Sequence, residues 1–401
     1  MKKSSAIKRG LACGAVFIPL LGCAMNFQEV SERAYDVSAN MIYTTGKVQA
    51  SDYERASAMA AEPLSLEGSA RRIRADDPIG TGTEYGMMVG FAVKTPGVKS
   101  AMNRQYDVLS KMYQAELQQQ KGLIQVALKR DWLLYVLSEE RVNILVDKMK
   151  LSETVYAMAL KKHAAGRMSQ MELLRFDTER QNAIQEHALA MMEAEHMQLG
   201  LKEATMLKEA VVVDDMPFEF IGDDGQVESR IDNAPAVGIL RVREEELDAE
   251  IALLRHSRVD KVSMGVGMTQ EPTQKSLDLK MVIPLVWNDK NEKKIAARMS
   301  ERTAVVTQRD AALAKLRVRT MGSLEHLQEW EKRIKELVRA EKNYETLFGM
   351  AKKGFEGGVV PQFEYIAAQN TFYNARLHAV DLKTNYVTEM SAMEEKLGRI
   401  W

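Results

Sequence analysis

Two stretches of this chain are too long and too regular to be helices of an ordinary globular domain. They run from about Val98 to Ala165 and from about Lys290 to Lys353, and neither contains a proline. In the second stretch apolar residues recur mostly at every third or fourth position, which is the spacing of one helix face. A helix of about 65 residues is roughly 100 Å long. Because uncapped periodicity beyond about 25 residues is typical of coiled coils, we expect elongated helical rods.

The chain also repeats itself at a single offset of 192 residues. The aligned pairs are Gly166 with Gly358, Glu172 with Glu364, Asn182 with Asn374, and Phe91 with Ile283. The first three pairs surround a turn, whereas the last pair lies in an alternating apolar run. An offset that aligns segments of different structural type indicates a tandem duplication. We therefore predict two repeats, 23–210 and 235–401, joined by a strand-bearing linker over 211–234.

Each repeat has the same order of predicted elements: a helix, two strands with period-two alternation, a long helix, a turn and a shorter returning helix. In the first repeat these are a helix over 27–61, a hairpin over 62–95, the helix 98–165 and the helix 169–207. In the second they are 235–256, 259–287, 290–353 and 361–397. Arginines 71, 72 and 74 weaken the first strand of the first hairpin. The predicted fold class is mainly α with a small β part.

The N-terminus has the pattern of an export signal. Basic residues precede a short apolar stretch from Gly10 to Leu21, which is too short for a stable membrane-spanning helix and suits a signal peptide over 1–22. The stretch ends Leu20-Leu21-Gly22-Cys23, which resembles the signal of bacterial lipoproteins, in which the cysteine is acylated and becomes the first residue. Leu21 is bulkier than the usual occupant of its position. The alternative is an ordinary signal peptide with a chance cysteine.

Charge and motifs exclude several classes of function. Loss of 1–22 removes four basic and no acidic residues, so the formal net charge goes from −1 to −5, which is unlike a nucleic-acid-binding protein. Cys13 would leave with the signal, and an acylated Cys23 leaves no thiol for a disulfide or a cysteine metal site. HExxH, P-loop and GxSxG motifs are absent. We therefore expect neither an enzyme nor a cofactor, and we interpret the methionines and histidines around His187 as helix packing.

Taken together, these features resemble the TolC-like outer-membrane efflux proteins, or outer membrane factors, of lipoprotein type. The resemblance rests on the order of elements, the duplication, the two glycine-containing turns with an acidic residue six positions on, Ile283-Pro284-Leu285 and Cys23. It implies that three chains form a tube, each giving four strands to a twelve-stranded barrel in the outer membrane. The tube would be a passive channel and the exit duct of a tripartite efflux or secretion system. Its partners would be a periplasmic adaptor and an inner-membrane pump, which selects the substrate.

The resemblance also assigns roles to particular residues. Cys23 would carry the lipid anchor, and Ala24 after it favours the outer membrane. The turns would lie at the periplasmic tip and contact the adaptor through Gly166, Arg167, Met168, Ser169, Gly357, Gly358, Val359, Val360 and Pro361. As local structure, glycine is a common helix C-cap and proline suits a first turn.

Two acidic residues just inside the returning helices, Glu364 and Glu172, are candidate gate carboxylates. Three copies would form a ring that favours cations, although an acidic residue also suits the positive end of a helix. Ala367 stands where relatives carry a second acid, which weakens such a ring. Two other functions remain open: a structural periplasmic coiled-coil lipoprotein without a pore, which would lack the strand pairs, and a periplasmic adaptor, which would have one helical hairpin.

Overall fold

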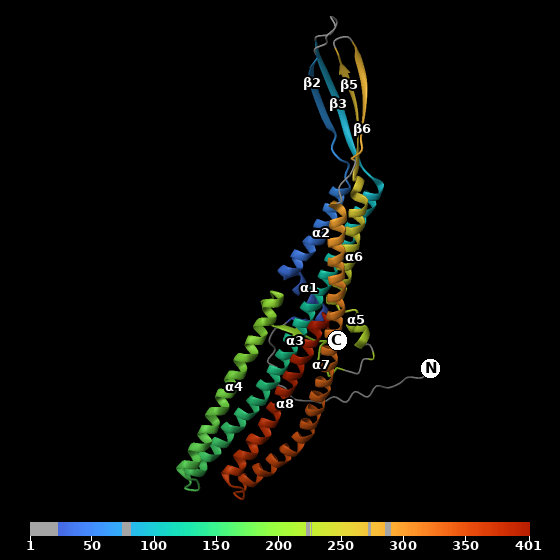
Figure 1. The fold of residues 1–401 in the computed structure, drawn as a ribbon. Helices are drawn as coiled ribbons and strands as arrows, with labels where there is room; N and C mark the ends of the chain where they lie inside the picture. The colour runs from blue at the N-terminus through green and yellow to red at the C-terminus, as the bar shows by residue number, and fades with distance from the viewer. Residues whose placement is uncertain (1–22, 74–81, 222–224, 226, 272–273, 285–289) are drawn as a thin grey trace, which may run out of the picture.

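The two long proline-free stretches each form one helix. They are α3 (Pro96–Ala164) and α7 (Lys290–Glu356), with 69 and 67 residues. At 1.5 Å per residue each is roughly 100 Å long, and the two helices set the length of the helical rod (Figure 1). The computed structural model describes residues 23–73, 82–221, 225, 227–271, 274–284 and 290–401. The predicted signal peptide, 1–22, and the predicted strand end at 285–287 lie outside these residues.

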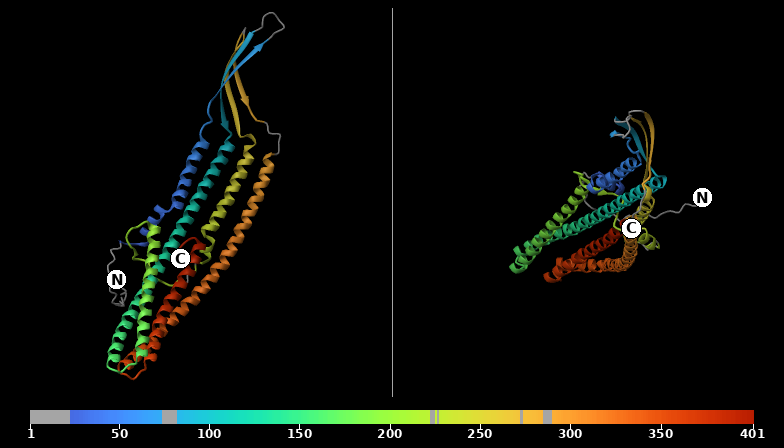
Figure 2. Two further views of the ribbon diagram at one scale, coloured as in Figure 1. Left: turned by 90° about the vertical axis from the view of Figure 1, so that its left-hand side faces the viewer. Right: turned by 45° about the horizontal axis from the view of Figure 1, so that its top comes forward.

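Each long helix is accompanied by two shorter helices that follow one another along its length. α2 (Ala39–Met59) and α4 (Gln170–Thr205) lie along α3, and α6 (Pro235–His256) and α8 (Gln362–Leu397) lie along α7 (Figure 2). Since α3 also contacts α6 and α8, the helices form one layer. α2 and α4 stand at one edge of this layer, and α7 stands at the other.

The duplication is visible in the helix boundaries. From Gln170 to Gln362 and from Thr205 to Leu397 are both 192 positions, so α4 and α8 begin and end at equivalent places. Each helix is followed by a residue in the left-handed region, Met206 with φ 53° and Gly398 with φ 67°. α4 and α8 therefore occupy equivalent places in the two predicted repeats.

The helix predicted over 27–61 is divided into α1 (Phe27–Val37) and α2. Ser38 separates them in an extended conformation. Its N–H donates to the carbonyl of Ala34 at 3.1 Å, and its Oγ accepts from the N–H of Met41 at 3.5 Å. One residue thus ends α1 and caps α2, and serine favours this role because its side chain replaces a missing backbone acceptor.

The linker forms a belt around the middle of the rod. β4 (Val211–Val213) pairs in parallel with β1 (Cys23–Met25), and α5 (Val227–Asp232) follows. Residues 216–221, which belong to the predicted strand-bearing linker, have no regular structure. Here side chains make the contacts instead: the rings of Phe218 and Phe220 lie 5.8 and 5.3 Å from that of Tyr386, whose hydroxyl accepts from the Ile221 N–H at 2.6 Å.

The largest hydrophobic core lies at the level of this belt. It joins residues of α1, α3, α7 and α8 to both short strands. A buried ion pair lies beside it: Lys129 Nζ is 2.6 Å from Glu394 Oε1, and the Glu394 side chain is fully buried. Glu394 also accepts from the N–H of Trp401 at 2.6 Å. The C-terminus is thereby held against α3.

A four-stranded antiparallel sheet caps the end of the rod away from the helical turns (Figure 1). Its strands are β2 (Ser65–Ile73), β3 (Gly82–Lys94), β5 (Lys261–Gln270) and β6 (Lys275–Val282), in the order β2-β3-β5-β6. Both hairpins are therefore present, including the first strand that the arginines weakened. The hairpins pair with each other through β3 and β5.

Candidate functional site

The sheet exposes its apolar face instead of burying it. Cross-strand neighbours on this face are apolar in successive rows; one row is Leu66, Val89, Val266 and Leu279, and the next is Gly68, Met87, Met268 and Leu277. Leu279 is 79% exposed and Leu277 is 70% exposed. Soluble proteins rarely expose a continuous apolar patch of this kind, which marks a surface for another molecule or for lipid. No helix in the described part of the chain is long and apolar enough to cross a membrane.

The opposite face of the sheet is mostly polar or small, although Met88 on β3 and Val282 on β6 also lie on it. Glu67, Ser69 and Arg71 on β2 and Ser276, Asp278 and Lys280 on β6 lie on it, and β5 contributes two glycines. One of them, Gly267, has no room for a side chain: a Cβ there would lie 2.8 Å from the Met87 carbonyl oxygen. The sheet therefore has one apolar face and one mostly polar face, as the wall of a lipid-facing barrel does, where the apolar face is outside and the polar face inside.

Two matched turns reverse the chain at the far end of the rod. Gly166 and Gly358 have φ values of 69° and 78°, which glycine adopts without the strain of a side chain. The N–H of Gly166 donates to His163 O at 2.9 Å, and the N–H of Gly358 donates to Phe355 O at 3.1 Å. The next residues, Arg167 and Val359, complete the same helix-ending motif.

Most of the predicted tip residues are exposed at these turns. Arg167, Ser169, Gly357, Gly358 and Pro361 are exposed, and Val359 is 83% exposed. Met168 and Val360 are partly buried; Val360 lies against Gly354, where a Cβ would approach its Cγ2 to 2.3 Å. An exposed valine on a turn offers apolar area to a partner without a change in the fold.

The two turns are tied together within one chain. Lys162 Nζ of α3 donates to the carbonyl of Phe355 on α7 at 3.1 Å and lies 4.2 Å from the centre of its ring. Gln362 Nε2 of α8 donates to the carbonyl of Glu172 on α4 at 2.7 Å. These contacts link the α3–α4 hairpin to the α7–α8 hairpin.

An aromatic cluster fills the space between the two hairpins. The ring of Phe355 lies 5.5 Å from Phe176 and 4.9 Å from Tyr365. This cluster is separate from the core at the belt. Tyr365 is buried, so the pKa of its hydroxyl is raised. We call the Lys162 and Gln362 contacts together with this cluster the tip latch. Sequence reasoning missed it, because its tied residues lie 190 and 193 positions apart in the sequence.

The two candidate gate carboxylates have different surroundings. Glu172 caps α4: its carboxylate accepts from the Ser169 N–H at 2.8 Å and from the Ser169 hydroxyl at 2.9 Å. The hydrogen bond from the Ser169 backbone holds the pKa of Glu172 below its ordinary value. Glu364 lies in the first turn of α8 and is exposed. The N-cap of α8, which corresponds to Ser169 of α4, is Pro361, and proline has no side-chain donor for Glu364.

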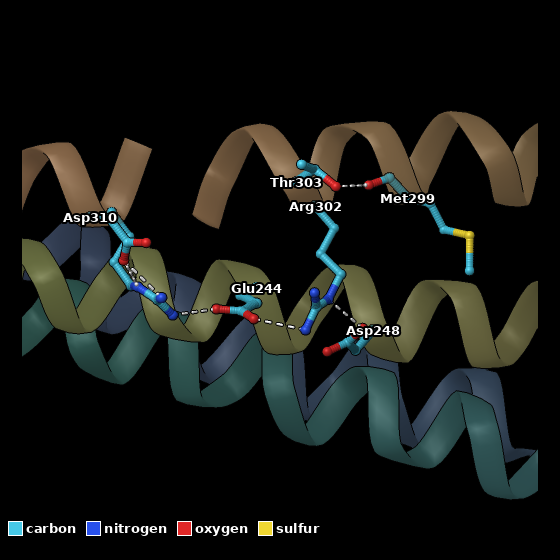
Figure 3. A network of polar contacts seen from close by, with 7 residues as sticks. Glu244, Asp248, Met299, Arg302, Thr303 and Asp310 are labelled. Atoms are coloured by element: carbon cyan, nitrogen blue, oxygen red, sulfur yellow. Dashed lines mark hydrogen bonds and ion pairs between the residues drawn. The ribbon is translucent and has the colours of Figure 1, made fainter. Parts of the chain in front are cut away.

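A ladder of ion pairs joins α6 to α7 between the sheet and the belt. Arg302 donates to Glu244 at 2.8 Å and to Asp248 at 2.7 Å, and Arg309 donates to the other oxygen of Glu244 at 2.7 Å (Figure 3). On the other flank Glu301 accepts from Arg298 and Arg243. The interface is therefore flanked by charge, as in coiled coils. Glu244 and Asp248 are four positions apart and Arg302 and Arg309 are seven apart, so each pair lies on one helix face, and this spacing is the signal that could have revealed the ladder.

Cys23 lies at the belt, far from the sheet. It opens β1, opposite Val211. The 11 residues of α1 and the 21 residues of α2 stand between it and the sheet, which amounts to about 48 Å of helix at 1.5 Å per residue. β1 is held by the N–H of Phe27, which donates to Asp215 at 2.8 Å. Within the described residues no group of three or more histidine, cysteine or acidic side chains is placed to hold a metal ion.

Neither a protein-family model nor a curated protein matches the sequence. Solved structures match its fold at low identity. A membrane protein from Pseudomonas aeruginosa is 12% identical, with a TM-score of 0.74 over 94% of this chain and 90% of that chain. CusC, whose crystal structures describe folding and transmembrane channel formation, is 14% identical, with a TM-score of 0.73 over 93% and 92%. The outer-membrane channel OprN is 14% identical, with a TM-score of 0.73 over 93% and 89%.

The chain has the fold of these outer-membrane channels. The likeness covers the sheet, the long helices and the belt, since it spans more than nine tenths of this chain. The fold expected from the resemblance to TolC-like proteins, with long helices and a four-stranded antiparallel sheet, is therefore confirmed.

Proposed function

We propose that this chain is one of three identical subunits of a passive outer-membrane channel, the exit duct of a tripartite efflux or secretion system. The observation that carries the proposal is the exposed apolar face of the sheet. A lipid-facing sheet must have no free edge, because lipid cannot satisfy its backbone groups. Four strands cannot enclose a pore, whereas twelve strands from three chains form a barrel of ordinary size.

The helices extend this barrel as a tube through the periplasm. The edges of the helical layer, α2 with α4 on one side and α7 on the other, are the surfaces that neighbouring copies would bring together. Exposed apolar side chains on α4, such as Leu189 at 66% and Met192 at 66%, support a partner along this edge. The rod of roughly 100 Å would carry the turns to an adaptor and an inner-membrane pump.

At the tip, the exposed turn residues would contact the periplasmic adaptor. Arg167, Ser169 and Val359 contribute a charge, a hydrogen-bonding group and apolar area. Among the two carboxylates, Glu364 is the better candidate for the gate, because Glu172 is committed to the cap of α4. Three copies of Glu364 would form a ring that attracts cations.

We also propose Cys23 as the lipid anchor in the outer membrane, on the strength of the sequence that precedes it. Its position at the belt sets a condition on this proposal. An acyl chain on Cys23 reaches the membrane only if β1 leaves β4 and part of α1 unwinds, because about 48 Å of helix separates it from the sheet. The acylated chain would therefore lack the β1–β4 pairing.

Single-channel recording in planar bilayers tests the central proposal. The purified protein, confirmed as a trimer by native mass spectrometry, should give discrete conductance steps. A variant of the apolar face, Leu279→Arg, should not insert, because a charge at the middle of the bilayer costs about 2–4 kcal/mol per chain. A trimer that inserts and gives no conductance with the tip latch removed would refute the channel.

A further inference from the structure

The two edge strands of the sheet touch each other through one ion pair. Lys280 Nζ on β6 lies 3.2 Å from Glu67 Oε2 on β2. β3 and β5 lie between these strands, so a flat sheet would hold their backbones about 14 Å apart at 4.8 Å per strand. The contact therefore requires the sheet to curl with its polar face inward. Two glycines, Gly90 on β3 and Gly265 on β5, lie in the row of Lys280, and the side chain of Met88 packs over Gly265.

The charges on the two edges are complementary in the order that an antiparallel pairing needs. On the polar face β2 carries Glu67 and then Arg71, and β6 carries Asp278 and then Lys280. Because each strand of the sheet is antiparallel to the next, β6 of one copy would run antiparallel to β2 of another. Placing Lys280 beside Glu67 then brings Asp278 within diagonal reach of Arg71.

The same pairing keeps both faces continuous. Side chains alternate with period two, so a register that pairs Lys280 with Glu67 on the polar face also brings Met281 next to Leu66 on the apolar face. A shift by two residues leaves every side chain on the same face. The edges match in length as well, with nine residues in β2 and eight in β6.

We propose that Lys280 and Glu67 exchange partners on assembly: within the free chain they pair with each other and hold the sheet curled, and in the assembled protein Lys280 pairs with Glu67 of a second copy across the β6–β2 seam. The inference rests on the proposed trimer and names the side chains of its seam. The backbone edges of β2 and β6 are not hydrogen-bonded to each other in the free chain, and such edges recruit other strands. When Lys280 changes partner in this way, the sheet uncurls to the wider arc of a barrel wall.

Cysteine crosslinking in the full-length, membrane-extracted protein tests this exchange. The variant Glu67→Cys with Lys280→Cys is treated with a short bismaleimide and resolved by denaturing electrophoresis. We expect covalent dimers and trimers to contain most of the chain. The matched control, Ala92→Cys with Lys280→Cys, places one thiol on the same face of the interior strand β3 and should give none. Each single-cysteine variant, treated in the same way, measures the crosslinking that involves the native Cys23.

The outcomes separate this inference from the proposed function. Crosslinks only within single chains, or none, in a sample that native mass spectrometry shows to be trimeric would overturn the exchange and leave the channel proposal standing. A sample without trimers would overturn both. A second measurement uses charge reversal: Glu67→Lys should lower the fraction of heat-resistant trimer, and adding Lys280→Glu should restore it. Failure of the swap to restore the trimer counts against the seam pair.

Discussion

Removing the tip latch should let the two helical hairpins of one chain separate. In Lys162→Met the side chain keeps its length and loses its charge, so the hydrogen bond to Phe355 O at 3.1 Å and the contact with its ring at 4.2 Å are both lost. A hydrogen bond from a charged group contributes about 1.5–3 kcal/mol, and an exposed cation–π contact contributes about 0.5–1 kcal/mol.

Because Lys162 is only partly buried, the lower end of these ranges applies, about 2 kcal/mol. With a factor of ten for every 1.4 kcal/mol, the ratio of separated to joined hairpins should rise about 30-fold in each subunit. Gln362→Met removes the second tie, 2.7 Å long, and should add to the effect.

Two measurements report this shift. Spin labels on Arg167→Cys and Val359→Cys should show a longer distance component in Lys162→Met, and single-channel recordings should show a higher open probability. Lys161→Met is the matched control, since Lys161 is exposed on the same helix turn. If Lys162→Met folds with an unchanged melting temperature, and neither the label distances nor the open probability differ from those of Lys161→Met, the latch reasoning is wrong.

Other perturbations give separate tests. Leu279→Arg on the apolar face should abolish insertion, whereas Ser276→Arg on the polar face of the same strand should insert and alter only ion selectivity; equal insertion of both would contradict the assignment of the faces. Glu364→Gln should lower the cation-to-anion permeability ratio, measured as a reversal potential, and an unchanged ratio would remove Glu364 from the gate. The hydrogen bonds from Arg298 and Arg243 hold the pKa of Glu301 below its ordinary 4.5. The ladder should therefore stabilise the protein above pH 4.5 and lose its effect as pH falls through the lowered value, and thermal melts of Glu301→Gln should lose this acid dependence. If Cys23 is acylated, hydrogen exchange at Val211–Val213 should be faster in the wild type than in Cys23→Ser, and equal rates would show that β1 stays paired.

Much of the fold was predictable because its signals are local and long. The helices α3, α4, α6, α7 and α8 follow from apolar periodicity without proline and from the glycine turns, and their boundaries fall within a few residues of the predicted ones. The amphipathic strands follow from period-two alternation. The duplication was readable because both repeats kept the same turn residues at one offset.

Other features depend on what lies beside a segment and were not predictable. Residues 216–221 have the composition of a strand, yet their aromatic rings pack against Tyr386 and they have no regular structure. The break at Ser38 is local by contrast: its N–H ends α1 at Ala34 and its side chain caps α2 through the N–H of Met41, which is a role that serine favours. The tip latch joins residues that are 190 and 193 positions apart, so no local pattern contains it.

By itself, the sequence determined the elements, their order, their duplication and the apolar face of each strand, because each of these is a periodicity or a turn written in consecutive residues. Only the tertiary structure decided that this apolar face stays exposed, that the edge strands meet through Lys280 and Glu67, and that Cys23 lies at the belt and not beside the sheet. The physical reason is that burial, pairing and reach are properties of distances between segments, and these distances arise when the helices pack.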